Sequence, residues 1–187
     1  MGIINNEKKW YALHIKPRQE FKAEAGLISL GIENYLPTIV VYKQWSDRKK
    51  RVTEPLIKSY IFIKANEKER LATLELKQVI RCLFYAGRPA VIPEFEIINL
   101  KNFISDKYEY RVVNSIVKGS IVKINDGPLA GVTGVVIDEQ DGKYFAVSVE
   151  LLNRSVITHI KDPRILEIFK EQKPARIKEV VDQPGLS

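Results

Sequence analysis

Cysteine, histidine and long apolar runs are scarce in this sequence of 187 residues. The one cysteine, Cys82, excludes a disulfide within the chain and fits a reducing compartment. A zinc site is not expected, because the chain has only two histidines, His14 and His159. Neither histidine stands near an acidic motif, and Cys82 lies in an apolar stretch, so no catalytic centre is indicated. The sequence therefore predicts no metal, no cofactor and no enzyme.

No apolar run approaches the roughly 18 residues that a membrane span requires. The stretch MGIINNEKKWY also lacks the apolar core of a signal peptide. An apolar content of 45% and a charged content of 28% are typical of ordinary globular proteins. We therefore expect a cytoplasmic protein with no membrane contact.

Charge is unevenly distributed along the chain. Residues 1–106 hold 18 lysines and arginines against 12 acidic residues, whereas residues 119–169 hold 5 against 7. If the protein binds nucleic acid, the first part is the better candidate. The alternative is that a basic domain of this size is merely soluble.

The first part alternates between strand-like and helix-like patterns. The capping-box pair Asn66 and Glu69 opens the second helix, and Ile97, Leu100 and Ile104 lie on one face of the third. Strands are expected over 10–15, 35–42, 57–64 and 79–85, and helices over 19–30, 67–76 and 94–104. The order β-α-β-β-α-β-α predicts an α+β, ferredoxin-like domain, with an antiparallel sheet and helices on one face.

The first part also predicts a buried helix face and a charged loop. In the first helix, the apolar residues Phe21, Ala25, Ile28 and Ile32 are expected to form the buried face. The stretch KQWSDRKKRVT, residues 43–53, is expected to be a charged loop between two strands.

The second part is built of short strands and turns. Strands are expected over 119–125, 132–138, 143–150 and 155–160, and a fifth short strand is expected over 164–168. Asp141 and Gly142 predict a hairpin turn, and five short strands in 51 residues suit a small SH3-like barrel. Its glycines are followed by a β-branched run rather than a helix, so they are expected to shape the barrel and not to cradle a phosphate.

The domain organisation follows from these patterns. We expect an N-terminal domain over residues 8–106, a linker over 107–118, the barrel over 119–169 and a mobile tail over 170–187.

Several stretches resemble those of a known family. VKINDGPLAGVTGVVID is similar to the KOW motif, and WYALHIKPRQEFKAEAGL, PLIKSYIFIK and VIRCLFYAGRPAVIP resemble the N-terminal domain of NusG-type transcription factors. Ser59 stands where housekeeping members usually have glycine, and GRPAVIP is more similar to the specialised RfaH and UpxY regulators of polysaccharide operons. The resemblance implies a transcription elongation or antitermination factor for a dedicated operon. The alternative is the general housekeeping factor.

Strand parity and the resemblance together predict a polymerase-binding surface. Apolar residues occupy both parities of the strands around 10–15 and 59–64, so both sheet faces should be covered. The cover could be the chain's own helices, barrel or a loop. The resemblance favours the clamp helices of RNA polymerase, which would contact Ala12, His14, Tyr60 and Phe62.

Two basic clusters are candidates for DNA binding. Arg48, Lys49, Lys50 and Arg51 lie in the 43–53 stretch beside Trp45, where nonspecific, salt-sensitive attraction is expected. A solvated charged loop is the alternative. The resemblance implies that the other cluster contacts the displaced non-template DNA strand and upstream duplex. That cluster comprises Lys16, Arg18, Gln19 and Lys22.

We expect a monomer that favours the closed, processive polymerase clamp and involves no bond chemistry. The acidic barrel suggests a protein partner, and the resemblance offers a ribosomal protein or the termination factor Rho. A ribosome-associated, RNA-binding KOW protein is the rival interpretation, and it predicts a basic barrel.

Overall fold

The computed structural model describes residues 6–45, 48–105, 108–139, 142–161 and 163–168. The expected tail over 170–187 and the Asp141 position of the expected hairpin turn lie outside these residues. Within the described part, no helix is long and apolar enough to cross a membrane.

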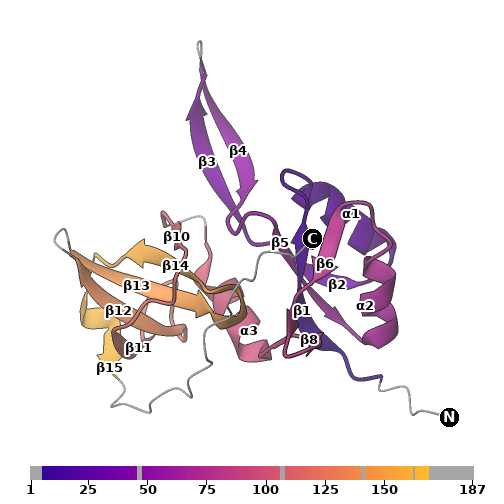
Figure 1. Ribbon diagram of the computed structural model, residues 1–187. Helices are drawn as coiled ribbons and strands as arrows, with labels where there is room; N and C mark the ends of the chain where they lie inside the picture. Colours follow the sequence, from indigo (N-terminus) through magenta and orange to yellow (C-terminus); the bar gives the residue numbers. More distant parts are fainter. Residues whose placement is uncertain (1–5, 46–47, 106–107, 140–141, 162, 169–187) are drawn as a thin grey trace, which may run out of the picture.

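The N-terminal half is built on one antiparallel sheet (Figure 1). Its strands run in the order β2-β5-β1-β6, and β9 also pairs with β1. The elements of this half are β1 (Lys9–Ile15), α1 (Glu20–Ser29), β2 (Glu33–Tyr35), β3 (Thr38–Gln44), β4 (Lys49–Pro55), β5 (Tyr60–Ala65), α2 (Glu67–Thr73), β6 (Val79–Cys82), β7 (Phe84–Tyr85), β8 (Arg88–Pro89), β9 (Val91–Ile92) and α3 (Glu94–Phe103).

The C-terminal half is a second antiparallel sheet, in the order β10-β14-β13-β12-β11-β15. Residues 111–113 fall within the expected linker, yet they form β10 and pair with β14. The elements are β10 (Arg111–Val113), β11 (Ser120–Ile124), β12 (Thr133–Glu139), β13 (Gly142–Val149), the 3₁₀ turn η1 (Glu150–Leu152), β14 (Arg154–His159), the 3₁₀ turn η2 (Pro163–Ile165) and β15 (Leu166–Ile168).

Local hydrogen bonds fix the start of helix α2. The Asn66 side chain accepts a hydrogen bond from the Glu69 backbone N–H at 2.9 Å, and the Glu69 carboxylate accepts one from the Asn66 N–H at 3.0 Å. This reciprocal pair satisfies two backbone donors at the helix start. The capping box expected from the sequence is confirmed.

Of the four residues expected on the buried face of the first helix, Ile32 is buried just after α1 and the other three are not. Phe21 and Ile28 are exposed, and so is Ala25, whereas Ala23 and Leu27 are fully buried. The first helical residue, Glu20, is also buried, where its carboxylate accepts the Ser59 backbone N–H. Because this contact and the packing of Ala23 and Leu27 set the rotation of the helix, Phe21 and Ile28 point outward.

The three helices lie on both faces of the N-terminal sheet, not on one face as expected. Tyr11, Leu13 and Ile15 of β1 share one apolar core with the buried residues of α1. Trp10 and Ala12, which have the opposite parity, belong to a second core that contains the buried side of α3. Ile97 and Leu100 of α3 are fully buried there, as expected from the helical spacing.

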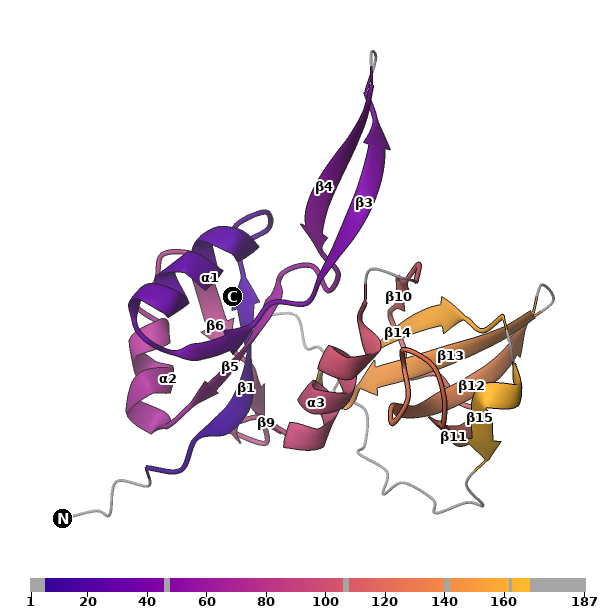
Figure 2. The ribbon, with the colours of Figure 1, turned by 180° about the vertical axis from the view of Figure 1, so that it is seen from behind.

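Helix α3 lies between the two sheets in both views (Figures 1 and 2). The Phe103 ring packs edge-on against Phe145 of β13, with 5.5 Å between ring centroids. The Asn99 side-chain oxygen accepts the Thr133 N–H at 2.9 Å, and its amide donates to the Thr133 carbonyl. The second core therefore continues from the N-terminal sheet through α3 into the C-terminal sheet.

Glycine is required at one point of that packing. A Cβ built on Gly134 of β12 would lie 2.3 Å from the Ala146 carbonyl oxygen and 2.6 Å from the Phe145 ring. Any larger residue would push β12 away from β13. This agrees with the expectation that the glycines shape the sheet.

Candidate functional site

The end of the sheet where β1 finishes and β5 begins carries a stacked aromatic pair. His14 and Tyr60 face each other across the β1–β5 ladder, and their rings stack with centroids 5.3 Å apart at 21°. Both side chains are half-buried. The pair therefore presents a flat aromatic surface of the kind that often anchors a protein interface.

The other two residues predicted for the same surface lie deeper. Ala12 and Phe62 are partners in the same ladder, and each has 0% of its surface exposed. They pack in the core beneath α3, because that helix covers their half of the sheet face. In this arrangement His14 and Tyr60 reach the surface, and Ala12 and Phe62 support them from below.

The backbone next to Tyr60 is held in an unusual conformation. Ser59 has φ +64°, a left-handed region that glycine adopts without strain and other residues rarely adopt. Its N–H donates to Glu20 Oε1 at 2.9 Å, and its carbonyl accepts the Ile15 N–H at 2.8 Å. Two contacts thus fix the residue that precedes the aromatic pair.

Sequence reasoning did not find Glu20. A carboxylate in the first turn of a helix usually faces solvent, yet Glu20 is only 5% exposed. The one available signal was Ser59, which stands where the resembling family usually has glycine. The Ser59 N–H is paired with the Glu20 carboxylate 39 positions earlier, a contact that sequence spacing does not reveal.

The first basic cluster lies in the turn between β1 and α1. Lys16, Arg18 and Lys22 are exposed, and Gln19 is half-buried at the start of the helix. Arg18 has φ +63°, the second left-handed residue in this region. A backbone hydrogen bond from the Gln19 N–H to the Lys16 carbonyl, at 3.0 Å, closes the turn. Three cations are thus displayed within a few residues of His14.

The second basic cluster does not lie in a loop, contrary to expectation. Strands β3 and β4 pair along their full length, from Thr38 opposite Pro55 to Gln44 opposite Lys49. They form a two-stranded ribbon that projects away from both packed halves (Figures 1 and 2). Three of its basic residues are in β4, namely Lys49, Lys50 and Arg51. Arg48 lies just before β4, near the tip, and all four side chains are exposed.

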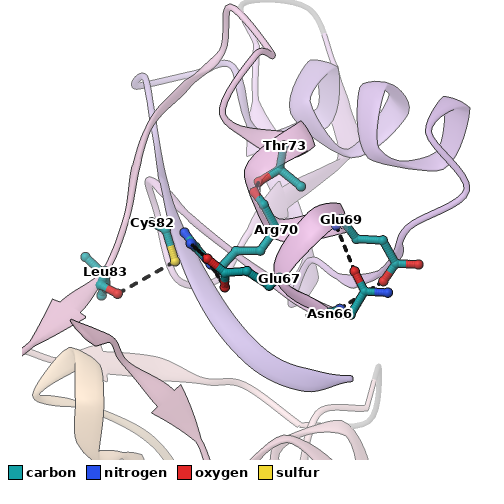
Figure 3. A network of polar contacts seen from close by, with 7 residues as sticks. All are labelled: Asn66, Glu67, Glu69, Arg70, Thr73, Cys82 and Leu83. Carbon is teal, nitrogen blue, oxygen red and sulfur yellow. Dashed lines mark hydrogen bonds and ion pairs between the residues drawn. The ribbon is translucent and has the colours of Figure 1, made fainter. Parts of the chain in front are cut away.

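A third group of polar side chains stabilises α2 and the neighbouring strand β6 (Figure 3). The buried Arg70 guanidinium forms two hydrogen bonds with the Glu67 carboxylate, at 2.6 and 3.1 Å. Beside it, Cys82 is 2% exposed, and burial raises the pKa of its thiol. A buried thiol with a raised pKa is a poor nucleophile. The expectation that Cys82 fills the core is confirmed.

No cluster of three or more histidine, cysteine or acidic side chains that could hold a metal occurs in the described part of the chain. What the structure does bring together at one end of the N-terminal sheet is an aromatic pair, a basic turn and the base of a basic ribbon. This arrangement is typical of proteins that act by binding.

Comparison with protein families agrees with that class. The NusG family model, described as "Transcription termination factor nusG", matches residues 8–101. The chain therefore belongs to the NusG family, whose members are transcription factors of the elongation phase. The comparison with curated proteins found no match.

Similar solved structures include two of low sequence identity. One, titled "Domain interaction in Thermotoga maritima NusG", is 18% identical, covers 88% of this chain and 98% of its own, and has a TM-score of 0.46. The other, from the "MjSpt4:Spt5 complex conformation B", is 16% identical, covers 88% and 99%, and has a TM-score of 0.34.

Proposed function

We propose that this protein is a transcription antitermination and elongation factor that binds RNA polymerase and serves a dedicated operon. The family match over residues 8–101 supports the general class. The observation that carries the proposal is the His14–Tyr60 pair, an aromatic surface beside three exposed cations. A factor bridging polymerase and DNA needs both features next to each other.

In this proposal the aromatic pair docks on the polymerase clamp helices. Tyr60 and His14 provide the contact, and Ala12 with Phe62 keep their strands in register beneath it. The hydrogen bond between the Ser59 N–H and Glu20 holds the backbone before Tyr60 and so lowers the ordering cost on binding.

The basic turn contacts the non-template DNA strand exposed beside the polymerase. Lys16, Arg18 and Lys22 supply cations for phosphates, and Gln19 supplies an amide for a base edge. Because phosphate contacts release counterions, this attraction weakens as salt rises. Binding of polymerase and DNA together favours the processive state of the clamp, by the difference between the affinities of the factor for the two clamp states.

The C-terminal half is proposed to be an SH3-like barrel of the KOW type. Residues 119–169 carry a net negative charge, which favours a protein partner, for which a ribosomal protein and Rho are the candidates. The proposed location is the cytoplasm, where transcription takes place.

In vitro transcription through a terminator tests this function. We expect the full chain to increase read-through on its own operon template with cognate polymerase. Tyr60→Ala should abolish the increase, whereas Tyr85→Ala, which removes an exposed aromatic on β7, should leave it intact. Equal read-through with and without the protein would refute the proposed function.

A further inference from the structure

The β3–β4 ribbon extends beyond the packed body, where isolated two-stranded ribbons gain little stability of their own. It is held together by cross-strand pairs such as Val41 opposite Val52. Its outer half is fully exposed, and Tyr42 has 73% of its surface in solvent. Such a surface contributes little to folding, so its residue types should reflect what it contacts.

The register divides the ribbon's outer half into two faces. Residues directly opposite each other point to the same side, and the side alternates along each strand. One face carries Tyr42 opposite Arg51 and Gln44 opposite Lys49. We name these four residues the reading face.

The other face is occupied with contacts inside the ribbon. Lys43 forms an ion pair with Glu54, and the Lys50 ammonium lies 5.4 Å from the centre of the Trp45 ring. These contacts partly satisfy the two lysines locally. On the reading face the Gln44 amide donates to the Trp45 carbonyl at 3.0 Å, and this face presents a phenol, an amide and two cations on one side of the ribbon.

We propose that the reading face enters the major groove of B-form duplex DNA. This inference rests on the proposed function, because the duplex is that of the transcribed template. The major groove is about 12 Å wide and admits a two-stranded β-ribbon. A seven-residue strand spans about 23 Å, so the tip reaches into the groove while the base stays at the sheet.

The side chains of the reading face match the chemistry of that groove. Arginine and lysine donate to guanine O6 and N7, and glutamine pairs with adenine N6 and N7. Arg51 and Lys49 are thus suited to guanine, and Gln44, directly opposite Lys49, is suited to adenine. Arg48, at the end of the ribbon, supplies a phosphate contact.

The same features disfavour other nucleic acids. Single strands are bound by several open aromatic rings on which successive bases stack. On this ribbon Lys50 approaches one side of the Trp45 ring, which leaves Tyr42 as the open ring. Duplex RNA has a deep, narrow major groove that side chains cannot read. The ribbon therefore fits duplex DNA best.

The test measures binding of the full chain by fluorescence anisotropy, without polymerase. The probes are a random-sequence DNA duplex, the same duplex with glucosylated 5-hydroxymethylcytosine filling the major groove, a DNA single strand and an RNA duplex. We expect the glucosylated duplex, the single strand and the RNA duplex each to bind about tenfold more weakly than plain duplex, as loss of a base contact implies.

Matched variants separate the ribbon from general charge. Lys49→Ala/Arg51→Ala should weaken binding to plain duplex and abolish the effect of glucosylation, because the groove contact is gone. Lys68→Ala/Lys77→Ala removes two exposed cations elsewhere in the chain and should keep the effect of glucosylation. Gln44→Ala, which changes no charge, should alter the motif selected from randomised duplexes and leave the salt dependence unchanged.

Three outcomes would overturn the inference: binding to the single strand or to the RNA duplex that is tighter than binding to plain duplex and is weakened by Lys49→Ala/Arg51→Ala, equal binding to plain and glucosylated duplex, or an equal loss of discrimination in the Lys68/Lys77 variant. Because no polymerase is present, these outcomes leave the read-through experiment untouched. A protein that raises read-through but fails here retains the proposed function and loses only the ribbon's role.

Discussion

Two antiparallel hairpins in this protein have similar local geometry and opposite surroundings. The β12–β13 pair packs Phe145 against Phe103 of α3, and its outer end carries Asp138 and Glu139. The β3–β4 pair buries no residue fully, and its outer end is basic. The core therefore stabilises the first hairpin, whereas the second hairpin contributes little to the core. The difference indicates which hairpin serves the fold and which is available to a partner.

The largest effect on stability should come from the contact between α3 and β12–β13. Phe103 is fully buried, so Phe103→Ala should lower the free energy of unfolding by about 3–5 kcal/mol through lost burial and a cavity. Urea denaturation measures it. Phe95→Ala on the same helix, where the ring is 68% exposed, should cost less than about 0.5 kcal/mol. Equal costs would show that α3 does not join the two halves.

A pH dependence should follow from Glu96, which also lies at this contact. Its carboxylate accepts the Glu150 N–H at 3.3 Å, and burial raises the pKa of Glu96 to about 7. Because the raised pKa means that the folded state holds the proton more tightly, this stabilisation is full below about pH 4.5 and is lost as pH rises through about 7.

Glu96→Gln should remove that dependence. The wild type should lose on the order of 2 kcal/mol of unfolding free energy between pH 5 and 8 relative to the variant. Urea midpoints across this range measure the difference. Glu94→Gln, at an exposed position on the same helix, is the control. Parallel pH curves for wild type and Glu96→Gln would contradict the prediction.

A smaller effect is expected in the segment that returns from the ribbon to the sheet. Ser59→Gly should raise the free energy of unfolding by up to about 1 kcal/mol, because glycine adopts the left-handed conformation without strain. Ser59→Ala retains the strain and should give no gain. Thermal melting of both variants measures the effect, and a gain with alanine equal to that with glycine would rule out backbone strain as the cause.

The smallest effect on stability should come from the ribbon itself. Tyr42→Ala removes a large but exposed ring and should change the free energy of unfolding by less than about 0.5 kcal/mol. Urea denaturation beside Phe145→Ala measures the contrast. A cost for Tyr42→Ala close to that of Phe145→Ala would mean that the ribbon serves the core, and the comparison between the two hairpins would fail.

Local chemistry made several features predictable from the sequence. The Asn66–Glu69 cap depends on residues three apart, so the start of α2 was predictable. Strands β11 to β15 were expected within a few residues of their observed bounds, because alternating apolar residues and turns delimit them, whereas β10 was expected to be linker. The buried residues of α3 also followed from helical spacing.

The features that were missed depend on contacts between distant residues. The rotation of α1 is set by the Glu20–Ser59 hydrogen bond, across 39 positions, and helical spacing alone did not identify it. Coverage of Ala12 and Phe62 depends on where α3 folds back. The ribbon was not predicted because its outer half, around Lys49 and Lys50, is polar and charged and lacks the alternating apolar residues that indicate a strand.

The most direct test of the central claim is a site-specific photo-crosslink from position 60 in the presence of a transcribing polymerase. With a photoreactive phenylalanine in place of Tyr60, the account predicts crosslinks to the polymerase clamp helices, and none from the same group in place of Tyr85. Crosslinks to the clamp from position 85 with none from position 60 would contradict the account.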